Sequence, residues 1–586
     1  MAVSKVAELQ GLFKRDDPAI WVSQMWDNYH SQRMGKLAEW QELRNYIFAT
    51  DTSTTTNSTL PWKNSTTLPK LCQIRDNLHS NYISAAFPND RWLTWEGFSK
   101  EDSTKSKVKA ITAYMANKCR HNHFRTEMSK LLYDYIDYGN AFATVDFEAS
   151  YKEDVHGEKV STYVGPVVRR ISPLDIVFNP IASNFRDTYK IVRSIKTIGE
   201  IKGMADDNPD EWFWQEALQA RSEVFKHLGK GYSREDWEKA AGFAVDGFGN
   251  LQEYYQSGYV EILEFFGDFH DEDGTLHRNK VVTIMDRSKV INVRDFPSWL
   301  GHAPIYQVGW RFRQDNLWAM GPLDNLVGLQ YRLDHLENLK ADALDLVVHP
   351  PLKIIGEVEE FMWMPGAEIH IDENGDVQEL GKNLNGIFSA NNELQLIEDR
   401  MELYAGAPRE AAGIRTPGEK TAFEVQTLNN AAGRIFQEKI VNFEIELLEP
   451  VLNAMLETAV RNMNQDDVVR TMDDDLGVTE FLTITREDIT ASGVIRPVGA
   501  RHFAKEAQDL QNLFSVFNSG AMPLLQDHVS GIELSKYIEE TLGITGYEIF
   551  KPNVRLEEQA ETQGLMNQFQ EDLEVEASVG AEGVMP

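Results

Sequence analysis

Residues 321–391 constrain the fold more than any other stretch, because a long helical pattern there is broken once and then resumes. Leucines recur at three- and four-residue steps from Leu323 to Leu344, after a Gly321-Pro322 start that suits a first helical turn. This spacing predicts one amphipathic helix over residues 322–348, about 40 Å long. His349 and two prolines end it, because a residue that precedes proline disfavours the helical conformation.

A β-type insert follows this break. Apolar and polar residues alternate at residues 352–355 and again at 368–378, and Asn374-Gly375 lies inside the second stretch. An Asn-Gly pair between alternating segments is a strong hairpin signal. The helical pattern then returns near Asn391. The region therefore predicts a long helical rod that carries a small β cap, an arrangement that suits an assembly part more than an enzyme.

Size and composition set wide bounds. The chain has 586 residues, of which 42% are hydrophobic, so it can bury large cores and is expected to hold several domains or one multilayered body. The sequence predicts no transmembrane helix, and its first residues lack the apolar core of a signal peptide. Two cysteines, Cys72 and Cys119, suit a reducing compartment and predict neither a disulfide framework nor a zinc site.

The formal net charge of −33 argues against tight DNA binding over the whole surface. Nucleic-acid binding needs a basic face, because phosphate contacts supply most of the affinity. Solubility alone explains such a charge, and composition by itself favours that interpretation. The charge also fits an acidic wall past which DNA slides, where few basic contacts would reduce sticking.

Helical and strand patterns both continue along the chain, so the sequence predicts an α+β, largely helical fold. Strands are expected at residues 141–148 and 160–171, and an antiparallel meander at residues 259–269, 280–285 and 290–293. A capping-box pattern at Thr421 opens a long helix that is expected to reach Asn462 with a kink at Pro450. Further helices are predicted at residues 18–50, 71–86, 105–137, 196–245, 501–518, 532–542 and 556–576.

The motif search yields no catalytic signature. Lys420 follows Glu419 where a phosphate loop requires glycine, so residues 418–421 are better explained as a loop that ends in a helix cap. Residues 267–274 lack the spacing of a calcium loop, and residues 473–477 have the composition of a surface turn. Neither a His-Glu-x-x-His motif nor a Gly-x-Ser-x-Gly elbow occurs. We therefore expect no enzyme activity, no catalytic residue, no metal site and no cofactor.

Two groups of residues are candidates for function. Arg409, Arg415 and Lys420 lie in a Gly- and Pro-rich stretch and form a modest basic group in an acidic protein. Ordinary loop charge explains them, and transient contact with DNA phosphates is the functional alternative. The second group is an apolar run in the small β insert, where exposed apolar residues indicate contact with a neighbouring subunit or a partner: Phe361, Met362, Trp363 and Met364.

Several short motifs occur in a fixed order along residues 60–520. They are Pro61-Trp62, Phe87-Pro88 with Trp92, Tyr138-Gly139-Asn140, the Arg-Ile-Ser-Pro-Leu-Asp run at 170–175, Ala303-Pro304-Ile305, and residues 407–422. This order resembles that of bacteriophage portal proteins, the head-to-tail connectors of short-tailed, podovirus-type phages.

The resemblance implies a portal fold, assembled as a ring of twelve subunits at one capsid vertex. Residues 1–320 would form an α/β wing, residues 321–348 and 391–405 two stem helices, and residues 349–390 a β-containing clip. Residues 406–420 would be a tunnel loop that carries Arg409, Arg415 and Lys420. Residues 421–500 would return to the wing as a long kinked helix, and residues 501–586 would form a helical crown or barrel with an acidic tail.

The implied function is a passive channel through which double-stranded DNA is packaged and ejected. Implied partners are terminase, tail adaptor or nozzle proteins, major capsid and scaffolding proteins, and internal core proteins, with residues 361–364 as clip contacts. The chain would be made in the host cytoplasm and would reside in the virion. Two alternatives stay open: another virion component, such as a tail or internal core protein, and a cytosolic enzyme or carbohydrate-binding protein that uses the tryptophans.

Overall fold

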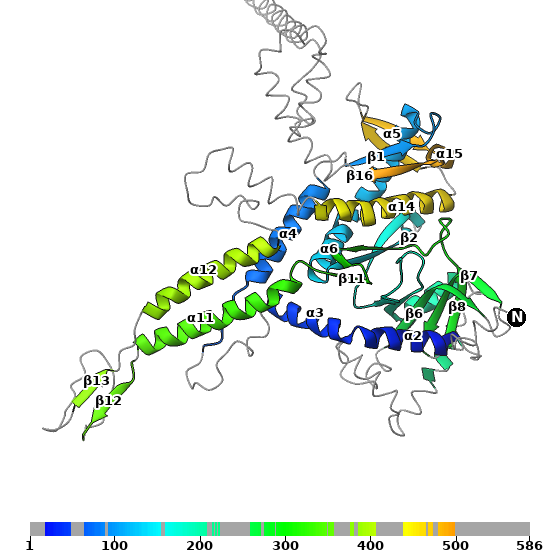
Figure 1. Cartoon of the computed structure of the whole chain (residues 1–586). Coiled ribbons are helices and arrows are strands. Elements are labelled where there is room, and N and C mark those ends of the chain that lie inside the picture. The colour runs from blue at the N-terminus through cyan, green and yellow to red at the C-terminus, as the bar shows by residue number, and fades with distance from the viewer. Residues whose placement is uncertain are drawn as a thin grey trace, which may run out of the picture. The chain divides into compact units, whose positions relative to one another are not determined.

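Figure 1 presents the computed structural model of the whole chain. The structure describes residues 18–48, 64–87, 92–153, 159–207, parts of 214–222, 258–270, 275–287, 289–348, 350–356, 376–379, 385–405, 438–463, 467–472 and 479–497. The chain divides into two compact units, residues 1–86 with 93–497, and residues 87–92 with 498–586. In the second unit the described rings of Phe87 and Trp92 meet edge to face, 4.7 Å apart. All elements below belong to the first unit.

A five-stranded antiparallel sheet forms one layer. Its strands follow chain order: β4 (Ile176–Phe178), β5 (Lys190–Thr197), β6 (Tyr259–His270), β7 (Leu276–Met285) and β8 (Lys289–Asp295). The meander predicted from β6 to β8 is thereby confirmed. The turn after β7 places Asp286 and Arg287 at positive φ, 47° and 57°.

The two faces of this sheet bury different partners, because successive side chains of a strand point to opposite sides. Leu263 and Phe265 face α2 (Pro18–Gln32), where Trp21 meets the Phe265 ring edge to face at 4.9 Å. Phe266 points to the other side and joins a core with Phe142 of the next sheet. One strand therefore supplies two separate cores.

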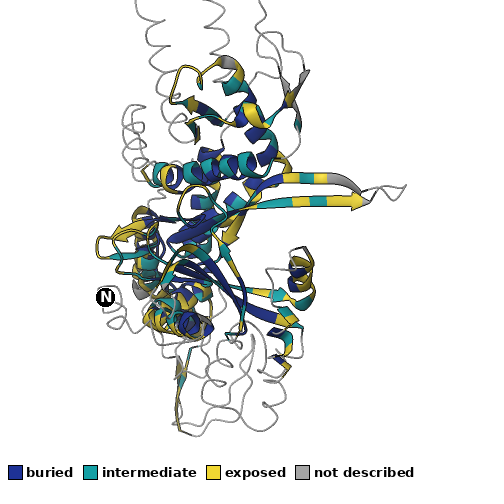
Figure 2. Cartoon of the chain, turned by 90° about the vertical axis from the view of Figure 1, so that its right-hand side faces the viewer, coloured by how far each residue is buried: buried dark blue, intermediate teal, exposed yellow. Residues whose placement is uncertain are grey.

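The second sheet has three antiparallel strands in the order β3-β2-β9, namely β3 (Lys159–Ile171), β2 (Asn140–Glu153) and β9 (Ile305–Gly309). It packs on the first sheet through Phe142, Ile171 and Ile305. Helices α6 (Phe124–Asp137) and α14 (Glu449–Asn462) also contact it. Burial along the long β2–β3 pair decreases from Phe142 toward Lys152, and the strand ends are yellow in Figure 2.

Two stretches expected as single helices are each divided. Residues 18–48 form α2 and α3 (Met34–Ile47), which Arg33 separates, and residues 105–137 form α5 (Lys105–His121) and α6. The Arg33 side chain is buried, and its Nη1 donates to the carbonyls of Pro173 and Ile176, each at 2.7 Å. His123 adopts the left-handed conformation between α5 and α6. Neither feature has a local sequence pattern that predicts it.

Pro450 interrupts its helix through a π-helical turn. Residues 444–448 bond with a five-residue step, and the Glu449 N–H donates to the Glu444 carbonyl just before α14. Proline has no N–H to donate and crowds the carbonyl four residues earlier, so a wider turn relieves the conflict. The irregularity predicted at Pro450 is therefore present, while the Thr421 end of that helix lies outside the described residues.

Other short elements complete the described part. They are α4 (Lys70–Ala86), α7 (Ile198–Asp207), α15 (Arg486–Ile489), and the antiparallel pairs β1 (Leu93–Gly97) with β16 (Gly493–Pro497), β10 (Arg311–Arg313) with β11 (Asn316–Met320), and β14 (Asp467–Met472) with β15 (Thr479–Ile484). The expectation of an α+β fold is confirmed by this mixture. None of the described helices has the length and apolar character that a membrane crossing requires.

The predicted rod is an antiparallel helix pair (Figure 1), and its ends join at a two-stranded β tip. The chain runs through a short 3-10 turn η2 (Asp324–Leu326), α11 (Val327–Val348), β12 (Leu352–Ile355), β13 (Asp376–Glu379) and α12 (Asn385–Ala405). The predicted helix is confirmed from Val327 to its predicted end at Val348, whereas the expected first turn is the 3-10 turn η2, and the strands at 352–355 and 376–378 are confirmed. Strand β13 pairs with β12, whereas residues 368–371, expected to pair across Asn374-Gly375, lie outside the described residues.

The return helix begins earlier than expected. Helix α12 begins at Asn385, six residues before the predicted Asn391. Gly386 and Ser389 have weak helix propensity and conceal this first turn in the sequence. At its other end the rod is anchored by close backbone approach: Gly139 has φ 68°, and a Cβ there would lie 2.3 Å from the Gly321 nitrogen.

Candidate functional site

The helix pair and its β tip expose large apolar side chains along their length. Leu323 and Leu326 before α11 and Leu333 within it are buried, whereas Leu339 and Leu344 are exposed, so the predicted leucine stripe is buried only up to the middle of the helix. Isolated exposed apolar residues are ordinary, but a concentration of them on one structural unit marks an interaction surface. The exposed members are Tyr331, Leu339, Leu344, Val348, Ile354, Ile355, Leu396, Leu403 and Tyr404.

The buried stripe of α11 is polar. Gln330, Asp334, Asn338 and Asp342 recur every four residues, and each is at most 4% exposed. Residues four apart lie on one side of a helix. We call these four residues the polar ladder, because they bond in sequence to the backbone of the extended segment at residues 64–68.

Alternate residues of that segment are bound in turn by Asp334, Asn338 and Asp342, and Gln330 donates to the Leu68 carbonyl at 2.7 Å. Asp334 Oδ1 accepts from the Leu68 N–H at 2.9 Å, and Asp342 Oδ1 accepts from the Asn64 N–H at 2.7 Å. Between them, Asn338 accepts from the Thr66 N–H at 2.8 Å and donates to the Thr66 carbonyl at 3.1 Å. A helix thereby does for this segment what a neighbouring strand does in a sheet.

In two carboxylates of the polar ladder, only one of the two oxygens accepts a hydrogen bond from a described residue. The outer oxygens of Asp334 and Asp342 are buried without a hydrogen-bond partner among the described residues. Burial raises the pKa of Asp334, while bonds from the Leu68 N–H and the Gln330 amide act in the opposite direction. A buried acceptor without a donor costs stability, so the ladder fixes position at some energetic cost.

A buried ion pair connects the same segment to α12. Lys70, the first residue of α4, lies 2.5 Å from Glu402 and is 7% exposed. Glu398, one turn earlier, lies at 3.9 Å. The polar ladder and this pair together attach the chain before and within α4 to both helices of the rod.

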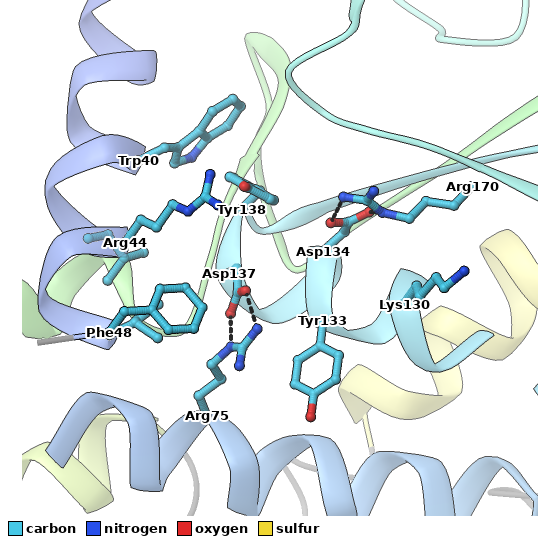
Figure 3. Close-up of a pocket in the computed structure, with 12 residues that line it drawn as sticks. Trp40, Arg44, Phe48, Arg75, Lys130, Tyr133, Asp134, Asp137, Tyr138 and Arg170 are labelled. Atoms are coloured by element: carbon cyan, nitrogen blue, oxygen red, sulfur yellow. Dashed lines mark hydrogen bonds and ion pairs between the residues drawn. The ribbon is translucent and has the colours of Figure 1, made fainter. Parts of the chain in front are cut away.

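A cavity of about 230 Å³ lies where α3, α4 and α6 meet (Figure 3). Helix α3 contributes an aromatic and aliphatic wall, and α6 contributes both aromatic and charged groups. The lining residues are Trp40, Leu43, Arg44, Ile47, Phe48, Arg75, Lys130, Tyr133, Asp134, Asp137, Tyr138 and Arg170.

Two bidentate ion pairs occupy the wall of this cavity. Arg75 donates to the two Asp137 oxygens at 2.6 and 2.8 Å, and Arg170 binds both oxygens of Asp134, with one contact at 2.7 Å. Burial raises the pKa of Asp134 to about 7 and also raises the pKa of Asp137, in each case against the paired guanidinium. Arg75 further lies 4.1 Å from the centre of the Tyr133 ring. The pairs hold both guanidinium groups in fixed positions.

The functional residues predicted from the sequence are not among those that the structure describes. Arg409, Arg415 and Lys420 fall outside the described residues, as do Phe361, Met362, Trp363 and Met364, so the geometry of both groups stays a prediction. Sequence reasoning missed the polar ladder, although its four-residue spacing is visible in the sequence, and it missed the cavity, which has no local pattern. No cluster suited to a metal ion occurs within the described ranges.

Comparisons with known proteins give a similarity at the level of structure. No protein-family model and no curated protein matches the chain. Among solved structures it is similar to a chain from the neck of an empty GTA particle, with a TM-score of 0.35 and 10% sequence identity over 83% of this chain and 92% of that one. A TM-score of 0.35 does not establish a shared fold. What the chain does is therefore inferred from its own residues.

Proposed function

We propose that this chain is a virion structural protein of the phage portal type, which assembles through the α11–α12 helix pair into a ring of twelve subunits. The observation that carries the proposal is the set of exposed apolar side chains along that pair, of which Leu403 and Tyr404 are 63% and 62% exposed. Apolar surface of this kind is stabilised by burial against another protein. Head-to-tail contacts between copies close into a ring when the rotation permits.

The motif order along residues 60–520 supports the same proposal, because it resembles portal proteins, whose stem is a helix pair with a β-containing clip at its end. In this role the ring is a passive channel for DNA and docks terminase and tail adaptors, and it performs no catalysis. Arg409, Arg415 and Lys420 would make brief contacts with DNA phosphates. If DNA were packaged at wild-type efficiency after charge reversal of Arg409, Arg415 and Lys420, the proposed phosphate contacts would be contradicted.

The direct test is negative-stain microscopy of the purified full chain, with native mass spectrometry for the number of subunits. Rings with a central hole and a mass near twelve subunits are expected. The variant Leu403→Glu should lower the ring fraction while its circular dichroism stays unchanged, because Leu403 is exposed in the single chain. Glu393→Gln, an exposed change on the same helix, is the control. A stable monomer or dimer of the wild type would overturn the proposal.

A further inference from the structure

The cavity between α3, α4 and α6 has more positive than negative charge in its lining. Four cations line it, against two carboxylates, and each carboxylate is already bound by an arginine. Lys130 pairs at 2.5 Å with Glu127, which does not line the cavity. The Arg44 side chain is exposed and makes no hydrogen bond or ion pair within the described part of the chain, while its charge acts on Asp137 from a longer distance. In a protein of net charge −33, this surplus is local and unusual.

A second observation concerns Trp40, which lines the same cavity one helical turn before Arg44. Trp40 is 2% exposed, and its indole Nε1 is buried with no hydrogen-bond partner among the described residues. Its ring is held edge to face against Tyr138 at 5.2 Å and Trp318 at 5.6 Å. A buried N–H without an acceptor is costly, so a residue in the wall of this cavity carries a donor that no described residue satisfies.

The size and rim of the cavity limit what it can receive. At about 230 Å³ it is smaller than the sites that enclose drug-sized ligands or nucleotides. Its rim includes Phe48, which is 53% exposed, and the half-exposed Lys130 side chain. Tryptophan, tyrosine and arginine are the residue types that dominate binding energy at protein interfaces. A single side chain of another protein therefore fits better than a nucleic acid, whose many phosphates the acidic protein repels.

We propose that this cavity is a docking socket for an acidic side chain of a partner protein, whose carboxylate pairs with Arg44 and whose apolar neighbour packs on Phe48. Arg75 and Arg170 stand in the wall of the cavity in their own bidentate pairs with Asp137 and Asp134 (Figure 3), so Arg44 supplies the positive charge that is not already paired. None of the residues that line the socket belongs to the α11–α12 pair.

The test uses the full-length protein and a fluorescein-labelled peptide of alternating glutamate with leucine and phenylalanine, followed by fluorescence anisotropy. The same peptide with glutamine in place of glutamate, and an oligothymidine of similar length, are the competing probes. We expect the acidic peptide to bind and the other two not to bind. Arg44→Gln should weaken that binding at least tenfold, because a charge-assisted hydrogen bond is lost.

Arg125→Gln is the matched control, because Arg125 is an exposed arginine on α6 that does not line the cavity. Trp40→Phe should also lower the affinity for the acidic peptide, while its circular dichroism spectrum stays unchanged. Equal affinity of the Arg44 and Arg125 variants would overturn the proposal. So would tighter binding of the oligothymidine than of the acidic peptide, or no peptide binding at millimolar concentration.

Discussion

Asp134 experiences opposing effects from burial and from charge. Its carboxyl is 4% exposed and bound on both oxygens by Arg170, yet burial raises its pKa to about 7. An aspartate in an unfolded chain has a pKa of about 3.9. Between about pH 4 and pH 7 the folded state therefore binds a proton that the unfolded state does not. Stability contributed by this group is greatest at the acidic end of that window and declines as the pH rises.

Asp134→Asn removes this titration. We expect the free energy of unfolding of the variant to increase relative to that of wild type as the pH rises from 5 to 7, by up to about 1.4 kcal/mol per pH unit, because only wild type loses stability over that range. Urea unfolding at several pH values measures the difference. Asp206→Asn, the same substitution at an exposed carboxylate on α7, is the control. A pH-independent difference for Asp134→Asn would show that the carboxyl is ionised throughout the window.

At the scale of elements, the polar ladder makes a helix the partner of an extended segment. Asn338 carries the middle step through two bonds to the Thr66 backbone. Asn338→Leu should leave both Thr66 groups without partners and lower the free energy of unfolding by about 1–3 kcal/mol. Hydrogen exchange should rise at residues 64–68, with Arg332→Gln on the exposed side of α11 as control. Unchanged exchange at residues 64–68 would show that other contacts hold the segment.

The elements that the sequence predicts well are those with local causes. The helix at 322–348 and the meander from β6 to β8 follow from periodic apolar patterns within a few turns or strands. The pairing of β1 with β16 joins residues 93–97 to 493–497, and no local pattern encodes a contact between segments about two-thirds of the chain apart. The sequence did not predict the polar ladder for another reason. Polar residues at a four-residue spacing suggest a solvated helix face, and only the folded structure shows them buried.

The cavity illustrates the same limit for a site. Arg44, Arg75 and Asp137 come from three helices, and each alone is an ordinary charged helix residue. Their meeting depends on how α3, α4 and α6 pack, which is set by the whole core. The tunnel-loop and clip residues predicted from sequence lie outside the described residues and stay predictions.

For the whole molecule, the net charge of −33 opposes the association of identical copies. Salt shortens the range of this repulsion from about 10 Å at 0.1 M to about 3 Å at 1 M, while apolar contacts are not weakened by it. If exposed apolar side chains drive assembly, the oligomeric fraction should increase between 0.05 and 0.5 M sodium chloride. Sedimentation velocity measures that fraction. Dissociation on adding salt would indicate that ion pairs, rather than apolar contacts, join the subunits.

The polar ladder also behaves as a vernier, in which two rulers of unequal spacing are laid side by side. Four residues of helix advance about 6.0 Å, whereas two residues of extended chain advance about 6.7 Å. The scales drift apart by about 0.7 Å per step, which flexible side chains absorb over three steps. At Leu346, one step beyond Asp342, the drift would reach about 2 Å, and the helix supplies no polar group there. The mismatch of two regular structures thus sets how far a ladder of this kind can extend along a helix.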